Sequence, residues 1–271
     1  MTVVLGVDGS RGRWVCARVG PDGVQWSVHT QAASLIAAAS GLDAVGIDVP
    51  IGVERVGDRA ADVAARARLH RSGASVFATP TLAAFTAALS ARADAEAADD
   101  PITVHDCWAV AHAAQRRTHP RGMGFSKQAW GLAAGILDVD AELCAAAVRR
   151  PSILDRVVEV HPECSYRAMA GAALSDGGAV WPAKKSAAGA ARRVRLAGTG
   201  LGLDADSVVR ALDDPALVSV PVDDALDALA AAWSARRWAN GIADVLGDPF
   251  GTRSGWSPSG ARLRLALRVV V

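Results

Sequence analysis

The sequence predicts an α/β fold with a mixed five-stranded sheet, whose first three strands are antiparallel, together with flanking helices and a large helical insertion. Two observations predict this fold. Three short apolar runs separated by turn residues open the chain, and two further runs of strand length follow at 42–49 and 157–161. Between those two runs, the segment 50–150 consists mainly of Ala-rich stretches that are typical of helices.

The first three strands are predicted from the pattern of residues 3–29. The run Val3-Val4-Leu5-Gly6-Val7 is typical of a buried strand, and it ends on the acid of Asp8-Gly9-Ser10. A second strand is expected over 12–19, and Pro21-Asp22-Gly23 is typical of a hairpin turn. Residues 24–29 alternate apolar and polar side chains, which indicates a third strand and completes an antiparallel meander.

The fourth strand is expected over 42–49, after a short helix over 31–40, and it also ends in a carboxylate, Asp48. A helical crossover after the meander should place this strand beside the first one and parallel to it. Asp8 and Asp48 should then emerge within a few ångströms of each other at the same end of the sheet. Two like charges there repel unless they share a proton or a cation.

The rest of the chain completes one expected domain, 1–246, with the helical insertion at about 50–150. No linker-like composition separates the insertion from its surroundings, so we do not expect it to be an independent domain. Residues 157–161 form the fifth predicted strand, and a strong helix is expected from Val222 to about Trp238. The tail 247–271 is expected to be an edge strand or disordered.

Composition restricts the classes of function. The net charge of +1 excludes a strong global field, so affinity for nucleic acid must come from a local patch. The four cysteines are far apart and form no CxxC pair, which favours a reducing cytoplasm. The N-terminus has no basic region typical of a signal peptide, and we expect no membrane-spanning segment.

Five acids form the main candidate site, because they lie at predicted strand ends or at the start of the last helix. Carboxylates are the hard oxygen ligands of Mg²⁺ or Mn²⁺ in sites that transfer phosphoryl groups with two metal ions. These acids are Asp8, Asp48, Glu159, Asp224 and Asp227. Asp223 or Asp224 is also well placed to cap the last helix. The alternative is therefore that Asp224 and Asp227 are only capping residues and that Glu159 is a surface acid on an edge strand.

Basic residues and a histidine add further candidates. His161, in the segment Glu159-Val160-His161-Pro162-Glu163, is a candidate general base or metal ligand, although a single His is often structural. The densest basic patch contains Lys184, Lys185, Arg192 and Arg193, which could bind phosphates of a nucleic-acid backbone. The alternative is a solvated helix face.

Six motifs in order resemble a known family. They are Gly6-Val7-Asp8-Gly9-Ser10, Ile47-Asp48-Val49-Pro50-Ile51-Gly52, Ser75-Val76-Phe77-Ala78-Thr79-Pro80, Glu159-Val160-His161-Pro162-Glu163, Lys184-Lys185 and Asp223-Asp224-Ala225-Leu226-Asp227-Ala228-Leu229-Ala230. Over about residues 2–245 the chain resembles the bacterial and archaeal family of unknown function 429 (DUF429), described as predicted nucleases of ribonuclease H-like fold. The resemblance therefore implies a ribonuclease H-like fold.

The resemblance also implies roles for the acids. Ribonuclease H-like enzymes carry acids on the first strand, on the fourth strand and at the start of the last helix, and Asp8, Asp48 and Asp224 fall on those positions. The run Asp224–Ala230 is similar to the last-helix motif of Holliday-junction resolvases, which would make Asp227 a further ligand. The acid that ribonuclease H has on its first helix finds no match in 31–40. Either Glu159 replaces it or the second metal ion is absent.

The resemblance and the acids together predict a nuclease that depends on Mg²⁺ or Mn²⁺. The expected metal ligands are Asp8, Asp48, Glu159, Asp224 and Asp227, with Lys184, Lys185 and Arg192 on the substrate phosphates. One alternative is an actin-like enzyme that binds ATP or transfers phosphate, although such enzymes need a second copy of the fold. Another is a catalytically silent binding protein. The expected partners are nucleic acid and, in a homodimer, a second copy of the chain.

Overall fold

The computed structural model describes residues 2–171, 181–247, 254–259, 264–266 and 268–271. The chain divides into two compact units. The first contains Met1–Val49, Ser152–Asp244 and Val270–Val271, and the second contains Pro50–Pro151 and Val245–Val269. Each unit is described by itself.

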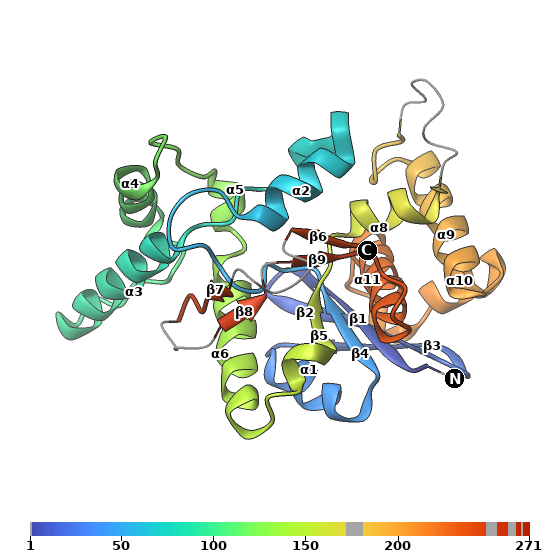
Figure 1. Ribbon diagram of the computed structural model, residues 1–271. Helices are drawn as coiled ribbons and strands as arrows, with labels where there is room; N and C mark the ends of the chain where they lie inside the picture. Colours follow the sequence, from blue (N-terminus) through green and yellow to red (C-terminus); the bar gives the residue numbers. More distant parts are fainter. Residues whose placement is uncertain (1, 172–180, 248–253, 260–263, 267) are drawn as a thin grey trace. The chain divides into compact units, whose positions relative to one another are not determined.

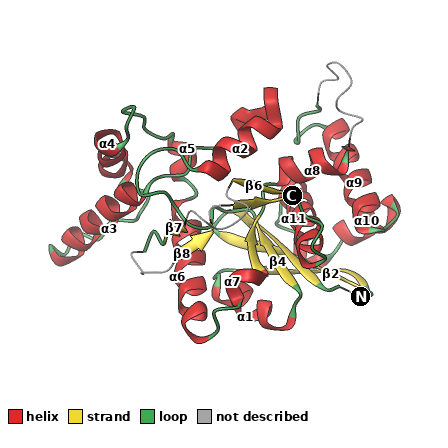
Figure 2. Cartoon of the chain, viewed as in Figure 1, coloured by secondary structure: helices red, strands yellow, loops and turns green. Residues whose placement is uncertain are grey.

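A five-stranded sheet forms the centre of the first unit (Figures 1 and 2). Its strands are β1 (Val4–Ser10), β2 (Arg13–Gly20), β3 (Gly23–His29), β4 (Ala44–Ile47) and β5 (Val157–Glu159). They lie in the order β3-β2-β1-β4-β5; the first three are antiparallel, and β4 is parallel to β1 and β5. The prediction of a mixed five-stranded α/β sheet that begins with an antiparallel meander is therefore confirmed.

Two helices of the first unit correspond to those predicted over 31–40 and from Val222 to about Trp238. They are α1 (Ala33–Ala38), α7 (Ile153–Arg156), α8 (Pro162–Met169), α9 (Ala187–Leu201), α10 (Ala205–Leu212) and α11 (Val222–Ala239), with short 3₁₀ turns η1 (Ala39–Gly41) and η4 (Pro215–Leu217). The fifth strand is shorter than predicted, because α8 begins at Pro162. Proline suits the first position of a helix, where its missing N–H has no partner to lose.

Helix α11 packs directly on the sheet, against β1, β2 and β4 (Figure 1). Its buried residues form an unbroken run from Ala225 to Ala235 in which most side chains are Ala. On the strands, Gly6 and Gly46 face this helix. A Cβ atom at Gly46 would lie 2.6 Å from the carbonyl oxygen of Ala231, and one at Gly6 would overlap the backbone of Ala228 and Ala232. Small residues on both sides thus bring the helix backbone against the strand backbone.

The second unit is mainly helical, as predicted for residues 50–150. Its helices are α2 (Ala60–Leu69), α3 (Leu82–Ala97), α4 (Trp108–Thr118), α5 (Lys127–Trp130) and α6 (Ala133–Arg149), with the 3₁₀ segment η2 (His70–Ser75). The described parts of the tail form short strands: β6 (Val245–Gly247), β7 (Ser254–Trp256), β8 (Arg264–Ala266) and β9 (Arg268–Val270). Residues 257–259 and Val271 are described but belong to none of these strands, and the other residues of the tail lie outside the described ranges.

A buried ion pair connects two of the motif segments in the second unit. The guanidinium of Arg59 lies 3.0 Å from Asp62 Oδ1 and donates hydrogen bonds to the carbonyl oxygens of Ile51 and Gly52, at 2.9 and 3.0 Å. The other oxygen of Asp62 accepts a hydrogen bond of 2.8 Å from the backbone N–H of Thr79. The segment that follows Asp48 is therefore fixed to the loop at 76–80.

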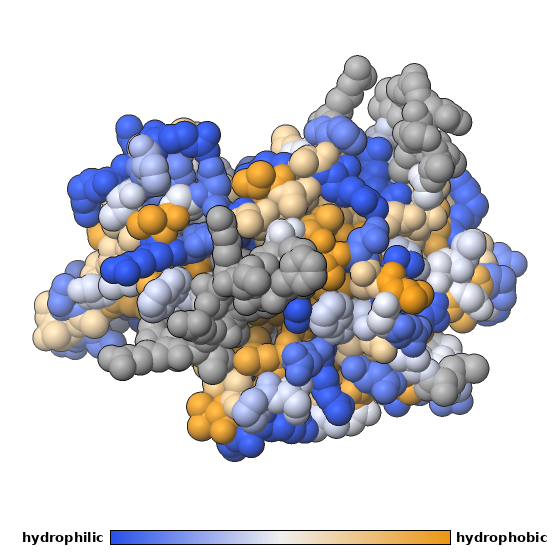
Figure 3. Space-filling view, viewed as in Figure 1, coloured by the Kyte–Doolittle hydropathy of each residue, from blue (hydrophilic) through white to orange (hydrophobic). Residues whose placement is uncertain are grey.

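The visible face of the molecule mixes hydrophilic and hydrophobic residues, as is normal for a protein surface (Figure 3). Within the described ranges, we find no helix with the length and apolar character needed to cross a membrane.

We expect Gly6→Ala to lower the free energy of unfolding by about 2 kcal/mol, because the new methyl group forces α11 away from β1. Urea denaturation of the purified protein measures this change. Gly41→Ala is the matched control, since a Cβ at Gly41 meets no atom within 4 Å. Equal stability of the two variants would contradict the close contact between helix and strand.

Candidate functional site

The register of the sheet brings Asp8 and Asp48 together. Val7 pairs with Ile47 across the parallel strands β1 and β4, and the N–H of Asp48 donates a hydrogen bond of 2.9 Å to the carbonyl oxygen of Val7. The next residue on each strand is an aspartate, so the two carboxyl groups are neighbours. A hydrogen bond joins their side chains. The predicted juxtaposition is therefore present.

Helix α11 adds a third buried carboxylate, Asp227. Side chains alternate between the two faces of a strand, so Asp8 lies on the same face as Gly6, the face that α11 covers. Asp227 lies one turn into α11 and is 4% exposed, and its charge acts on both Asp8 and Asp48. Three elements that are distant in sequence thus deliver three carboxylates to one site.

Asp223 and Asp224 occupy the first turn of α11. The sequence suggested that one of them caps the helix, and this prediction is wrong, because the capping position is held by Pro221 without a side-chain hydrogen bond. Both acids still favour the helix, since carboxylates near an N-terminus interact well with its dipole. The charge of Asp224 acts on Asp8, so this predicted residue also lies near the site.

The carboxyl groups of the site have raised pKa values. Burial is the largest cause for Asp8, followed by repulsion from Asp48 and Asp227, and its pKa lies well above the usual range. Burial also raises the pKa of Asp48, and repulsion from Asp227 adds to it. For Asp227, burial raises the pKa to about 6, against the opposing effect of Lys184. Burial and mutual repulsion therefore both disfavour the ionised forms of Asp8 and Asp48.

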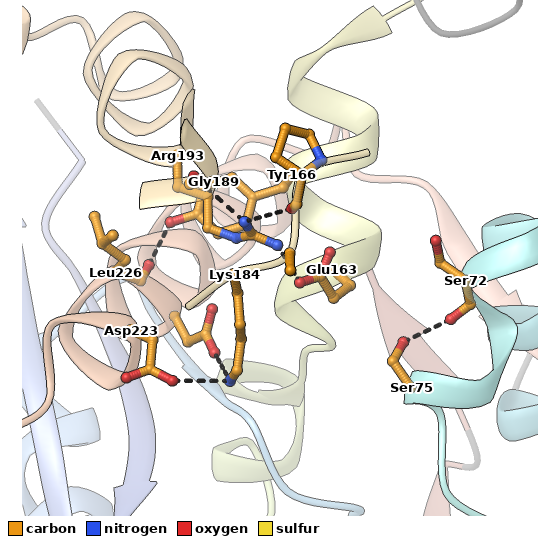
Figure 4. A network of polar contacts seen from close by, with 12 residues as sticks. Ser72, Ser75, Glu163, Tyr166, Lys184, Gly189, Arg193, Asp223 and Leu226 are labelled. Atoms are coloured by element: carbon orange, nitrogen blue, oxygen red, sulfur yellow. Dashed lines mark hydrogen bonds and ion pairs between the residues drawn. The ribbon is translucent and has the colours of Figure 1, made fainter. Parts of the chain in front are cut away.

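Lys184 neutralises part of this charge (Figure 4). Its Nζ lies 2.9 Å from Asp227 Oδ2 and 3.7 Å from Asp223 Oδ2. Burial disfavours the ammonium, but the carboxylates of Asp227, Asp8 and Asp223 outweigh it, and the pKa of Lys184 is raised. The sequence indicated a phosphate-binding lysine at this position. The structure instead shows its ammonium among the carboxylates.

The other basic candidates lie elsewhere. Lys185 is exposed, and the guanidinium of Arg192 stacks 4.3 Å from the centre of the Trp181 ring. Arg193 was a candidate for binding phosphate, but it is buried, pairs with Glu163 and donates a hydrogen bond to the carbonyl oxygen of Gly189 (Figure 4). Of the basic patch, Lys184 alone forms ion pairs with the acids of α11 among the described residues.

Glu159 and His161 take different positions from the aspartates. Glu159 is buried and pairs in register with Ile47, so it lies on the opposite face of the sheet from Asp8 and Asp48. Its charge still acts on Asp48 and raises the pKa of that carboxyl group. His161 precedes α8, and its carbonyl oxygen accepts the N–H of Ser165. The catalytic roles of both residues stay predictions.

The oxygen atoms of the site differ in whether they already have a partner. In the part of the chain that the structure describes, no three His, Cys, Asp or Glu side chains form a ready-made metal site. Two carboxyl groups share a hydrogen bond and Asp227 binds Lys184, so several oxygens already have partners. Asp227 Oδ1, however, is buried without a hydrogen-bond partner among the described residues, which is costly unless an ion or water satisfies it. Carboxylate oxygens are the ligands that Mg²⁺ and Mn²⁺ prefer.

Sequence reasoning missed two features of the site. The ion pairs of Lys184 with Asp223 and Asp227 join residues about 40 positions apart, and no periodic pattern in the sequence predicts them. The buried pair of Glu163 and Arg193 was not predicted because Arg193 lies among other basic residues, Arg192 and Arg195, which gave no sign that it is buried. The burial of Arg193 could have been inferred only from its spacing. Arg193 lies four residues after Gly189, on the side of α9 that carries small residues.

A family model matches residues 6–251 and is described as "Protein of unknown function (DUF429)". Comparisons with curated proteins and with solved structures gave no match. The match spans most of the chain and contains every acid of the site described above. The chain therefore belongs to the DUF429 family of proteins of unknown function.

Proposed function

We propose that this protein hydrolyses phosphodiester bonds of nucleic acid with a divalent cation, Mg²⁺ or Mn²⁺, held by its buried carboxylates. One observation carries the proposal: Asp8, Asp48 and Asp227 come from three separate elements and share one site despite their mutual repulsion. Like charges gathered by a fold, with pKa values far from the usual range, are typical of functional sites.

We also propose that the fold is ribonuclease H-like. The strand order β3-β2-β1-β4-β5, with an antiparallel meander and then parallel strands, supports this assignment. The positions of the acids also support it. They lie on the first strand, after the fourth strand and on the last helix, close to the positions of the acids in ribonuclease H-like enzymes.

The ligands we propose are Asp8, Asp48 and Asp227, with Asp224 nearby. A divalent cation bound there would polarise a phosphoryl oxygen and lower the pKa of a bound water. Asp8 and Asp48 would release the proton between them, and Lys184 would hold Asp227 in position. Glu159 on the opposite face would tune the charge of Asp48, and His161 stays a candidate base.

Basic surface residues and the cysteines support the proposals on substrate and compartment. Lys185 and Arg195 are exposed near the start and middle of α9 and could contact a phosphate backbone, as could Arg192. All four cysteines are free and buried, which supports the proposal of a cytoplasmic protein. The homodimer stays a prediction.

The proposal predicts that the protein binds Mn²⁺ at its carboxylates. Titration calorimetry at pH 7.5 should show saturable heat for the wild type, and Asp8→Asn should weaken binding by at least about tenfold because a ligand is lost. Asp22→Asn, in the turn before β3, is the matched control and should bind as the wild type does. Equal binding by Asp8→Asn would contradict the assigned ligands.

Hydrolysis should depend on the same residue. A panel of single- and double-stranded DNA and RNA, assayed with Mn²⁺, should include at least one substrate that the wild type cleaves. Asp8→Asn should lower that rate by about 100-fold or more, since losing a metal ligand costs at least as much as losing its supporting partners. Cleavage that Asp8→Asn retains would come from a contaminant and would leave the proposal without support.

Raised carboxyl pKa values also predict a dependence of stability on pH. A carboxyl group whose pKa is raised on folding stabilises the protein at low pH, and this contribution is lost as the pH rises through the folded-state pKa, about 6 for Asp227. In EDTA, Asp8→Asn should therefore be more stable than the wild type at pH 8, by about 1 kcal/mol or more, and the difference should shrink toward pH 5. Urea denaturation at both pH values measures this.

The stability test has its own control. Asp22→Asn removes an exposed carboxylate and should change stability equally little at pH 8 and pH 5. If Asp8→Asn were less stable than the wild type at both pH values, Asp8 would be a satisfied structural residue.

A further inference from the structure

A pocket of about 760 Å³ lies within the first unit, at a distance from the carboxylates of Asp8, Asp48 and Asp227. Its lining comes from the turn between β2 and β3, the C-terminal end of α9 and the second half of α11 (Figure 1). Asn240 lines the pocket just after α11, whereas Asp227 lies near the start of that helix. A helix rises about 1.5 Å per residue, which separates these two positions by about 20 Å. Thr2, also in the lining, precedes β1, and Asp8 lies near the end of the same strand.

The lining of this pocket carries positive charge. Arg236 and Arg237 both contribute to it, and none of the described residues that line it is Asp or Glu. The guanidinium of Arg236 donates hydrogen bonds to the carbonyl oxygens of Gly200 and Leu201, the latter at 3.0 Å. Carbonyl groups at the end of a helix lack partners within the helix, so these bonds attach Arg236 to the end of α9. They leave its positive charge without a carboxylate.

The charge of Arg236 is partly buried. Burial lowers the pKa of its guanidinium, and no carboxylate of the described residues offsets this effect. Asp22, Asp204 and Asp244 are near lining residues in the sequence, but they do not line the pocket. Asp204 instead accepts hydrogen bonds from Ser207. A cation held only by backbone carbonyl groups is costly to bury, and an anionic ligand would reduce that cost.

Further hydrogen-bond donors lie in the same lining. Arg237 donates from Nε to an oxygen of Val271 at 3.2 Å and from Nη2 to the carbonyl oxygen of Ile242 at 2.7 Å. The amide oxygen of Asn240 accepts a hydrogen bond of 2.9 Å from Thr2 Oγ1, so the amide NH₂ group is left as a donor. Guanidinium groups bind carboxylate and phosphate groups through paired N–H donors. The polar part of the lining therefore suits an anion.

Apolar side chains form another part of the lining. A Cβ atom at Gly200 would lie 2.9 Å from the indole of Trp233, so the glycine lets this ring lie against α9. The guanidinium of Arg237 lies 4.9 Å from the centre of the same ring. Ile242 also lines the pocket and is 59% exposed. Trp233 and Ile242 thus give the pocket an apolar surface next to its cationic one.

We propose that this pocket binds a small organic anion, a molecule that joins a phosphate, sulfonate or carboxylate group to an apolar part. The anionic group would contact Arg236 and Arg237, and the apolar part would contact Trp233 and Ile242. The volume of about 760 Å³ lies within the range of roughly 300–1,000 Å³ that is typical of small-molecule sites. This inference does not depend on the proposed function, because the pocket and the carboxylates lie at opposite ends of α11.

Fluorescence titration of the full chain with anilinonaphthalene sulfonate, an anionic aromatic dye, tests the pocket. The wild type should bind one dye molecule saturably. Ile242→Asp places a like charge next to the bound anion and should raise the dissociation constant at least about tenfold. Ile242→Lys should bind the dye at least as tightly as the wild type. Val218→Asp is the matched control, because Val218 is 92% exposed and lies outside the lining; it should bind as the wild type does.

A pair of competing ligands that differ in charge tests the recognition of the anion. Naphthalene carboxylate should displace the dye from the wild type. The neutral naphthalene carboxamide should compete at least about tenfold less well, since it loses the charge-assisted hydrogen bonds to the guanidinium groups. Arg236→Gln should remove most of this preference for the carboxylate.

Equal dye binding by Ile242→Asp and Val218→Asp would overturn the proposal, even if Arg236→Gln did not fold. Equal competition by the carboxamide and the carboxylate would overturn it too, because the charge would then not be recognised. Inorganic phosphate that displaced the dye as well as naphthalene carboxylate does would show that the apolar part is not recognised. That result, or the lack of saturable dye binding by the wild type, would also contradict the proposal.

Discussion

The site depends on the close contact of α11 with the strands beneath it. Gly6 and Gly46 have no side chain to hold the helix away, and the Ala residues of α11 complete the fit. Asp8 and Asp48 lie two residues beyond these glycines, on the same face of the sheet. A helix held at a larger distance would move Asp227 away from both. Backbone packing in the core therefore sets the distance between carboxylates at the edge of the sheet.

Bringing these acids together is unfavourable without a counter-charge. Burial removes the carboxylates from water, and their mutual repulsion raises the pKa values further. The chain reduces the cost in two ways, through the hydrogen bond between Asp8 and Asp48 and through the ion pair of Asp227 with Lys184. Neither device satisfies Asp227 Oδ1. A fold selected for stability alone would gain by replacing one acid with a neutral residue.

The strands of the sheet were predicted well, because the residue patterns that identify a strand or a turn lie within short segments of the sequence. The alternation of residues 24–29, the turn at 21–23 and the two apolar runs ending in Asp8 and Asp48 each occupy fewer than ten residues. Strand pairing then followed from the rule for crossovers. Two predictions failed for different reasons: α11 begins at Val222, before both acids that were candidates for its cap, and the environment of Arg193 depends on its contact with the distant Glu163. The position of Glu159 could not be predicted from the strand pattern alone. A shift of one residue in the register of a strand moves a side chain to the other face of the sheet.

The ribonuclease H-like fold that we propose would carry a further acid on its first helix. Helix α1 and the 3₁₀ turn after it contain no Asp or Glu, so this helix supplies no fourth carboxylate to the site. Glu159, the alternative source, lies on the face of the sheet away from Asp8. The segment before α9 delivers Lys184, which pairs with Asp223 and Asp227 and supplies positive charge to the acids that are present. Replacing Lys184 by a neutral residue would leave Asp227 buried without this counter-charge, so the site depends on the lysine as well as on its acids.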